Sequence, residues 1–327
     1  MRLILLTICF GALAGCVTQP LADNHDGGDG GVDGGTTGAG GQPTLFADHE
    51  WPSSLALDAT NLYWTTQTGE IVRRALDGSG DRTVLASGQL KPWAIALDAT
   101  SVYWVAGLGN PGSTVSKTPL DGSGAVTTLA TGIITPYALA VDGANIYWET
   151  TDGNIMRASA SGEDPTVMAS GQDQPQDIAV DADTLYWLTL GTVMKMPKAG
   201  GAMVELASKV PNGQSLTLDA DHVYWSTSEG TIGSVGKSGA GLTTLASGLG
   251  VGPNSPYCVV ADGTGAIYWT NGGNDVVVRM VPPSPTRTLV ASGQNFPDKI
   301  VTNATSLYWF NGAGDANGAT IWTIAKP

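Results

Sequence analysis

The stretch WAIALDATSVYWVAGLGNPGSTVSKTPLDGSGAVTTLA, residues 93–130, decides the fold. Four short segments in it are rich in β-branched, aliphatic and aromatic residues, which favour strands. Polar, Gly-containing turns separate them, among them Asp121-Gly122-Ser123-Gly124. The predicted strands are residues 93–97, 102–105, 115–118 and 126–130.

The dipeptide Tyr-Trp in this stretch recurs at spacings of 38 to 44 residues along the whole chain. The pairs are Tyr63-Trp64, Tyr103-Trp104, Tyr147-Trp148, Tyr186-Trp187, Tyr224-Trp225, Tyr268-Trp269 and Tyr308-Trp309. Four strands in about 40 residues is the size of one β-propeller blade. Adjacent strand residues point to opposite faces, so both aromatic side chains are buried only if each blade is covered on both faces. The pattern predicts an all-β, seven-bladed β-propeller of four-stranded blades over residues 43–327.

The last repeat lacks its own fourth strand, because it ends at Ile321-Trp322-Thr323-Ile324. Thr44-Leu45-Phe46-Ala47, which precedes the first repeat, matches fourth strands such as Thr288-Leu289-Val290-Ala291. We therefore expect this N-terminal strand to complete the last blade, so that the ring closes without an open edge.

Before the repeats stands a leader. Arg2 precedes an apolar run over residues 3–13, and Leu13-Ala14-Gly15-Cys16 closely resembles the lipobox of bacterial lipoproteins. The resemblance implies a signal peptide over residues 1–15 and a palmitate-type acyl anchor on Cys16, which would hold the protein on a membrane. Val17 stands where an Asp can mark inner-membrane retention, so we expect the outer membrane of a bacterial cell envelope.

Residues 16–42 are expected to form the acylated cysteine and a flexible tether. The segment repeats Asp and Gly, for example in Asp26-Gly27-Gly28-Asp29, without apolar periodicity. Glycine makes ordering costly in entropy and the aspartates repel one another, so such a segment stays an open chain.

The first repeat, Tyr63-Trp64-Thr65-Thr66 followed by Ile71-Val72-Arg73, resembles the YWTD repeats of lipoprotein-receptor propellers. Similar Ile/Val-x-basic steps recur at Val115-Ser116-Lys117, Ile155-Met156-Arg157 and Val193-Met194-Lys195. The fourth motif residue is never Asp here, and the receptor propellers usually have six blades. The resemblance therefore implies the fold more than any function.

Composition narrows the possible functions. A formal net charge of −14 disfavours a nucleic-acid partner. Cys258 has no partner for a disulfide outside the leader, and no histidine pair has metal-ligand spacing. No catalytic residue and no cofactor is predicted. Ca²⁺ stays open, because Asp315 and Asn317 alternate as oxygen ligands, although the loop lacks the glutamate of a full Ca²⁺ site.

Departures from the repeat locate a candidate ligand site. Four aromatic residues outside the Tyr-Trp pairs stand between one blade's fourth strand and the next blade's first: Trp51, Trp93, Tyr137 and Tyr257. Long loops of blades two and seven, the latter with Asp315 and Asn317, are expected on the same face. Loops on a rigid scaffold are the usual place for recognition, although these aromatics could instead pack between blades.

The leading interpretation is a membrane-anchored, non-enzymatic binding protein whose propeller face recognises a protein, peptide or glycan. The alternatives are a propeller hydrolase or lyase with a site at the central channel, and a structural envelope protein. An enzyme should gather Asp, Glu or His at the channel. The aligned positions, from Ser53-Ser54 to Asp298-Lys299, are mostly neutral, which favours binding.

Overall fold

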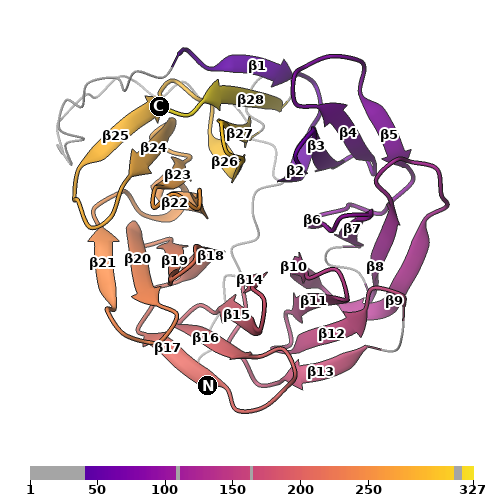
Figure 1. Cartoon of the computed structure of the whole chain (residues 1–327), viewed down its shortest axis with the longest axis horizontal. Helices are drawn as coiled ribbons and strands as arrows, with labels where there is room; N and C mark the ends of the chain where they lie inside the picture. Colours follow the sequence, from indigo (N-terminus) through magenta and orange to yellow (C-terminus); the bar gives the residue numbers. More distant parts are fainter. Residues whose placement is uncertain (1–40, 108–110, 163–164, 313–318) are drawn as a thin grey trace, which may run out of the picture. The chain divides into compact units, whose positions relative to one another are not determined.

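The computed structural model describes residues 41–107, 111–162, 165–312 and 319–327, all of which belong to one compact unit. Seven antiparallel sheets of four strands each follow one another around a ring (Figure 1). The prediction of a seven-bladed β-propeller is confirmed.

In each blade, the four strands lie side by side at increasing distance from the axis of the ring (Figure 1). The innermost strands are β2 (Pro52–Leu57), β6 (Ile95–Leu97), β10 (Pro136–Val141), β14 (Asp177–Val180), β18 (Gly213–Leu218), β22 (Pro256–Ala261) and β26 (Pro297–Thr302). The second strands are β3 (Asn61–Thr66), β7 (Ser101–Ala106), β11 (Asn145–Thr150), β15 (Thr184–Leu188), β19 (His222–Thr227), β23 (Ile267–Asn271) and β27 (Ser306–Asn311).

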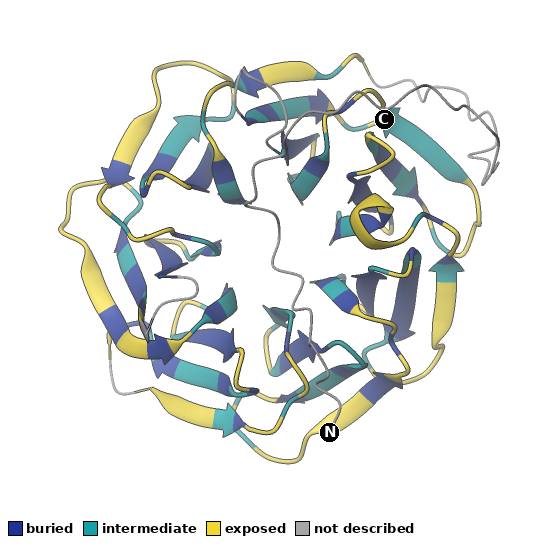
Figure 2. Cartoon of the chain, turned by 180° about the vertical axis from the view of Figure 1, so that it is seen from behind, coloured by how far each residue is buried: buried dark blue, intermediate teal, exposed yellow. Residues whose placement is uncertain are grey.

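The outer half of each blade is more exposed than the inner half (Figure 2). The third strands are β4 (Ile71–Ala75), β8 (Pro111–Pro119), β12 (Ile155–Ser159), β16 (Thr192–Pro197), β20 (Thr231–Gly236), β24 (Val276–Met280) and β28 (Thr320–Ala325). The outermost strands are β5 (Thr83–Ala86), β9 (Thr127–Ile134), β13 (Thr166–Ala169), β17 (Val204–Ser208), β21 (Thr243–Ala246), β25 (Arg287–Ala291) and β1 (Thr44–Ala47). One short 3-10 helix, Gly252–Asn254, precedes β22.

The first strand of the described residues, β1, belongs to the last blade. β1 pairs antiparallel with β28, with Thr44 opposite Thr323 and Leu45 opposite Trp322. This pairing gives the seventh sheet the order β1-β28-β27-β26 and covers the outer edge of β28.

The Tyr-Trp pairs form the core between blades. Every inter-blade cluster contains the tyrosine of one blade and the tryptophan of the next; Tyr63 with Trp104 and Tyr308 with Trp64 are two examples. The tyrosines are at most 3 % exposed and the tryptophans at most 5 %. Because adjacent strand residues point to opposite faces, each pair serves two interfaces, as the sequence predicted.

A hydrogen bond joins four of the seven buried indoles to the preceding connection. Gln89, Gln172 and Gln294 accept from the Nε1 atoms of Trp104, Trp187 and Trp309 at 2.9–3.0 Å, and Glu50 accepts from Trp64. Apolar residues stand at this position before Trp148 and Trp269, namely Ile133 and Leu249. The Nε1 atoms of those two tryptophans have no hydrogen-bond partner within the described residues.

The recurring aspartates organise the turn between the first and second strands. Asp58 Oδ1 accepts from the main-chain N–H groups of Thr60 and Asn61, and its Oδ2 accepts from the Tyr63 hydroxyl at 2.7 Å. Asp98, Asp142, Asp181 and Asp219 repeat the bond to tyrosine. These carboxylates are therefore bound in turns and hold the blades, and this structural role accounts for their recurrence at one position of the repeat.

The Ile/Val-x-basic steps connect neighbouring blades. Arg73 donates to the main-chain oxygen of Leu120, and Lys117 donates to that of Ala160, in each case in the next blade. Two lysines outside these steps, Lys198 and Lys237, also join blades, because they form ion pairs with Asp142 and Asp181 of the preceding blades at 2.7 and 3.0 Å. The motif residues that resemble the YWTD repeat thus act in packing the ring.

Candidate functional site

The inner strands surround the axis of the ring (Figure 1). In each blade, one pair of aligned residues lies at or just before the start of this strand. A left-handed residue precedes six of these strands; these residues are Trp51, Lys91, Thr135, Gln174, Asn212 and Phe296. The sharp bend places the next residues at the beginning of the inner strand. The first member of each pair is Ser53, Trp93, Tyr137, Gln176, Gln214, Tyr257 or Asp298, and all seven are half-buried.

Three aromatic side chains stand at these positions. The rings of Trp93 and Tyr137, from blades two and three, lie 6.0 Å apart between centroids at an interplanar angle of 50°. Tyr257, from blade six, is near enough to Tyr137 for the two hydroxyls to interact electrostatically. In contrast to the buried Tyr-Trp pairs, all three side chains keep partial contact with solvent.

Charged groups from blades three, four and seven join the aromatic residues. Asp298 and Lys299 begin β26, Asp177 begins β14, and Glu149 follows the Tyr-Trp pair in β11. Burial raises the pKa of Asp298 from its ordinary value of 3.8 to about 7, although Lys299 opposes this shift. The Cys258 thiol, followed by Asp177 and Asp298, raises the pKa of Lys299. We call Trp93, Tyr137, Glu149, Asp177, Tyr257, Asp298 and Lys299 the axial site.

Glu149 is the residue that sequence reasoning missed. Its side chain is fully buried, and neither carboxyl oxygen has a hydrogen-bond partner among the described residues. Burial and then the negative charge of Asp177 hold its pKa well above the ordinary range, which favours the uncharged acid. Comparing the seven repeats of the sequence could have identified Glu149, because the residue after Tyr-Trp is uncharged in the other blades: Thr65, Val105, Leu188, Ser226, Thr270 and Phe310.

Cys258 is buried beside the axial site. It is 4 % exposed, and its Sγ lies 3.6 Å from the Ser215 hydroxyl and 3.8 Å from the main-chain oxygen of Ile300. The small side chain fills the space between the starts of β18, β22 and β26. This placement agrees with a packing role for the thiol.

The structure separates the sequence-predicted ligand residues into three groups. Trp93, Tyr137 and Tyr257 belong to the axial site. Trp51 stands directly before Pro52, at the position of Lys91 rather than Trp93, and is 37 % exposed. Asp315 and Asn317 lie outside the described residues.

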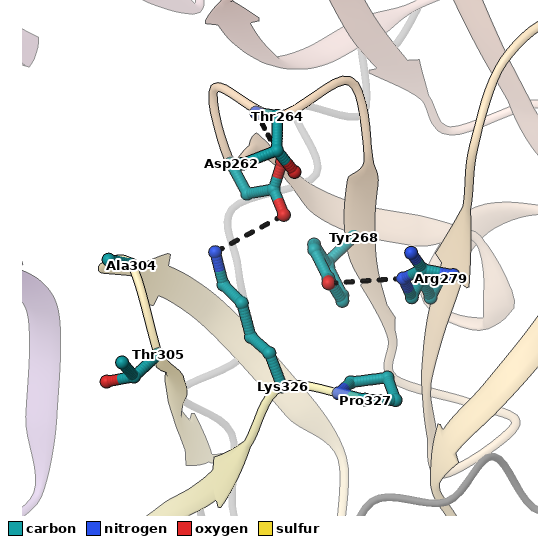
Figure 3. A pocket seen from close by; sticks show the side chains of 8 residues that line it. All are labelled: Asp262, Thr264, Tyr268, Arg279, Ala304, Thr305, Lys326 and Pro327. Carbon is teal, nitrogen blue, oxygen red and sulfur yellow. Dashed lines mark hydrogen bonds and ion pairs between the residues drawn. The ribbon is translucent and has the colours of Figure 1, made fainter.

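Two cavities lie away from the axial site. A cavity of about 470 Å³ lies where blade six meets the C-terminal residues (Figure 3). Its charged groups are already paired: Lys326 Nζ lies 3.3 Å from Asp262, and Arg279 donates to the Tyr268 hydroxyl. A second cavity of about 420 Å³, at β1 and β28, includes His49, Asn311 and Trp322 in its lining.

The described part of the chain contains neither a cluster of metal ligands nor a membrane-spanning helix. No three His, Cys, Asp or Glu side chains gather there in an arrangement that could hold a metal ion. No helix among residues 41–107, 111–162, 165–312 and 319–327 is long and apolar enough to cross a membrane.

Comparison with known proteins supports the fold. No protein-family model matches the chain, and neither does any curated protein sequence. Among solved structures, a chain of the nidogen/laminin complex is 19 % identical, with a TM-score of 0.57 over 73 % of this chain and 95 % of that chain.

Two other solved structures are similar over more of the chain. A catalytically inactive variant of virginiamycin B lyase from Staphylococcus aureus, with quinupristin, is 14 % identical, with a TM-score of 0.71 over 88 % of this chain and 99 % of that chain. The WD40 β-propeller domain of Doa1 is 12 % identical, with a TM-score of 0.67 over 90 % of this chain and 97 % of that chain.

These likenesses define the class of protein. The chain is a seven-bladed β-propeller with YWTD-like repeats. Its structural neighbours include a chain of a protein–protein complex and a lyase. At these identities the comparison shows the architecture alone.

Proposed function

We propose that the chain is a lipid-anchored binding protein of the bacterial cell envelope, and that its axial site recognises a protein, peptide or glycan. Cys16 would carry the acyl anchor, and residues 17–42 would tether the propeller to the outer membrane.

One observation carries the proposal: the axial site holds three aromatic side chains that stay partly exposed, although Trp93 also packs against the core between blades two and three. The Tyr-Trp aromatics are buried between blades, whereas Trp93, Tyr137 and Tyr257 remain half-buried at the axis. The Oε1 atom of Gln214 at the same level is buried without a partner among the described residues. Half-buried aromatics surrounded by polar groups are typical of binding hot spots.

The test is retention of a partner by the full-length chain. Cell-envelope extract is passed over the wild-type protein and over Trp93→Ala and Tyr257→Ala variants, and the affinity of each retained partner is then measured. Each substitution should weaken binding by about 2 kcal/mol, roughly thirtyfold in Kd. Trp51→Ala is the matched control, because it removes an exposed tryptophan outside the axial site and should leave the affinity unchanged.

Stability separates this proposal from simple packing. Trp148→Ala removes a fully buried core side chain and should cost about 3–5 kcal/mol of unfolding free energy. If Trp93→Ala and Tyr257→Ala destabilise the protein as much, those aromatics are blade packing and the proposed site is wrong. If wild-type protein retains nothing, a structural envelope role gains support.

A propeller hydrolase or lyase remains the second candidate, and Asp298 favours it. A carboxyl group with a pKa of about 7 can donate and accept a proton near neutral pH, as a general acid–base catalyst must. Wild-type protein and the Asp298→Asn variant should be compared on a panel of lactones, esters and glycans. Turnover by wild type that is lost in Asp298→Asn would establish an enzyme; equal product formation by both would argue against Asp298 as the catalyst.

A further inference from the structure

Carboxyl groups outnumber cationic groups in the axial site. Glu149, Asp177 and Asp298 interact electrostatically with a single lysine, Lys299. Asp177 is partly satisfied, because it accepts from the main-chain N–H groups of Ile178 and Leu216 at 2.9 and 2.8 Å. The carboxyl groups of Glu149 and Asp298 make no hydrogen bond or ion pair with any described residue.

Lys299 does not neutralise its neighbour directly. Asp298 and Lys299 are adjacent in β26, in the stretch between Pro297 and Ile300 where the pairing with β27 is irregular. Within the described residues, none of the ion pairs includes Lys299. Asp298, which is only half-buried, therefore stays available for an external positive charge.

The aromatic side chains are also free of cations. Lysine or arginine groups of the protein lie over the rings of Phe46, Tyr103, Tyr186 and Tyr268, at 5.2–6.0 Å. Within the described residues, no such contact involves Trp93, Tyr137 or Tyr257. An aromatic face next to a carboxylate attracts an organic cation through both the ring quadrupole and the ionic charge.

We propose that the axial site binds an organic cation, the alkylammonium or guanidinium group of a basic side chain on a partner peptide, between Asp298 and the rings of Trp93, Tyr137 and Tyr257. This inference rests on the proposed binding function and specifies the chemistry of its ligand. A neutral glycan, which has no positive charge to offer the carboxyl groups, is the competing outcome.

Binding of a cation should release protons. The groups that interact electrostatically with Asp298 are Lys299 on its own strand, Tyr257 on β22 and Tyr137 on β10. Cys258 on β22, Glu149 on β11 and Asp177 on β14 interact with Lys299. Only Lys299 among them favours the ionised Asp298, so a second positive charge stabilises the carboxylate and displaces its proton. A neutral ligand lacks this effect.

The test is calorimetric titration of the full-length chain in a non-ionic detergent. The probes are N-acetyl-arginine amide, its neutral isostere N-acetyl-citrulline amide, and cellobiose as a neutral sugar. The arginine probe should bind at least roughly tenfold more tightly than citrulline. At pH 6.5, the heat should differ between buffers of different ionisation enthalpy, which shows proton release. Equal affinity for arginine and citrulline, or tighter binding of cellobiose, would overturn the proposal.

Two substitutions should act in opposite directions at pH 8.5, where Asp298 is more fully ionised. Asp298→Asn should weaken binding of the arginine probe roughly tenfold, and Lys299→Gln should strengthen it a few-fold, because it removes a like charge. Asp81→Asn removes an exposed carboxylate elsewhere and is the charge control. The inference is wrong if Lys299→Gln weakens binding or if both axial variants match wild type.

Failure of the inference differs from failure of the proposed function. A wild-type protein that retains an envelope partner through Trp93 and Tyr257, yet does not distinguish arginine from citrulline, refutes only the cation. Loss of both properties refutes the binding function itself.

Discussion

Asp298→Asn should stabilise the protein above neutral pH. The folded state holds the pKa of Asp298 at about 7, against an ordinary value of 3.8. Folding therefore favours the protonated form of this group. Its contribution to stability is complete below pH 3.8, decreases as the pH rises, and is lost above pH 7. Asparagine cannot ionise, so the variant avoids this loss.

The expected size follows from the two pKa values. Each pH unit between them corresponds to about 1.4 kcal/mol, so the full difference would be roughly 4 kcal/mol. Solvent reaches part of the Asp298 side chain, which lowers the penalty for its charge. We therefore expect the variant to be more stable than wild type by about 2 kcal/mol at pH 8.5 and by almost nothing at pH 4.

The assay is urea unfolding followed by tryptophan fluorescence at pH 4, 5.5, 7 and 8.5. Glu149 also has a raised pKa, and it changes the unfolding free energy with pH in the same direction. The quantity to compare is therefore the difference in unfolding free energy between the variant and wild type at each pH. Asp81→Asn, which removes an exposed carboxylate outside the axial site, is the control. A stability difference for Asp298→Asn that does not change with pH, or that favours wild type at pH 8.5, would show that Asp298 is not held protonated by the fold.

Three further predictions concern the anchor and the ring. Cys16→Ser should block lipidation, so the variant should leave the membrane fraction; unchanged partition into a detergent phase would disprove the anchor. Gln172→Leu leaves the buried Trp187 N–H without its acceptor and should cost about 2 kcal/mol, measured by urea unfolding. In a Trp187→Phe background the same change should cost less than half as much, and an unchanged cost would show that the hydrogen bond is irrelevant. Lys209 occupies a left-handed position with φ of 56°, where five other blades have glycine, so Lys209→Gly should raise stability by roughly 0.5–1 kcal/mol; a lower melting temperature would contradict this.

The fold was predictable because its main signal is local and repeated. Tyr-Trp in a strand fixes which two faces are buried, and seven copies at near-constant spacing fix the number of blades. The pairing of β1 with β28 was also predictable from the sequence, since Thr44–Ala47 resembles the outer strand that the last repeat lacks.

The bonds between repeats were harder to predict. Gln172 precedes Trp187 by 15 residues and belongs to the connection of another blade. Nothing in the local pattern of Gln172 indicates that its side chain reaches an indole. The equivalence of these positions becomes clear only when the repeats are aligned with one another, which places Ile133 and Leu249 at the position of Gln172.

The axial site was only partly predictable for the same reason. Trp93, Tyr137 and Tyr257 depart visibly from the repeat, so the sequence alone singles them out as candidates. Glu149 lies in a strand directly after the Tyr-Trp pair, where a core residue is expected. Its proximity to Lys299 and Asp177 depends on how blades three, four and seven meet at the axis. Charges from different blades converge there only in three dimensions.

The pairing of β1 with β28 sets the order of events when the chain folds. Thr44 leaves the ribosome among the first residues of the propeller, and its partner Thr323 among the last. The first strand must therefore wait, unpaired, until nearly the whole chain has been made. Contacts this distant along the sequence slow folding, because a long loop must close before they form. Six blades can assemble locally, but the seventh interface and the closed ring come only at the end of synthesis.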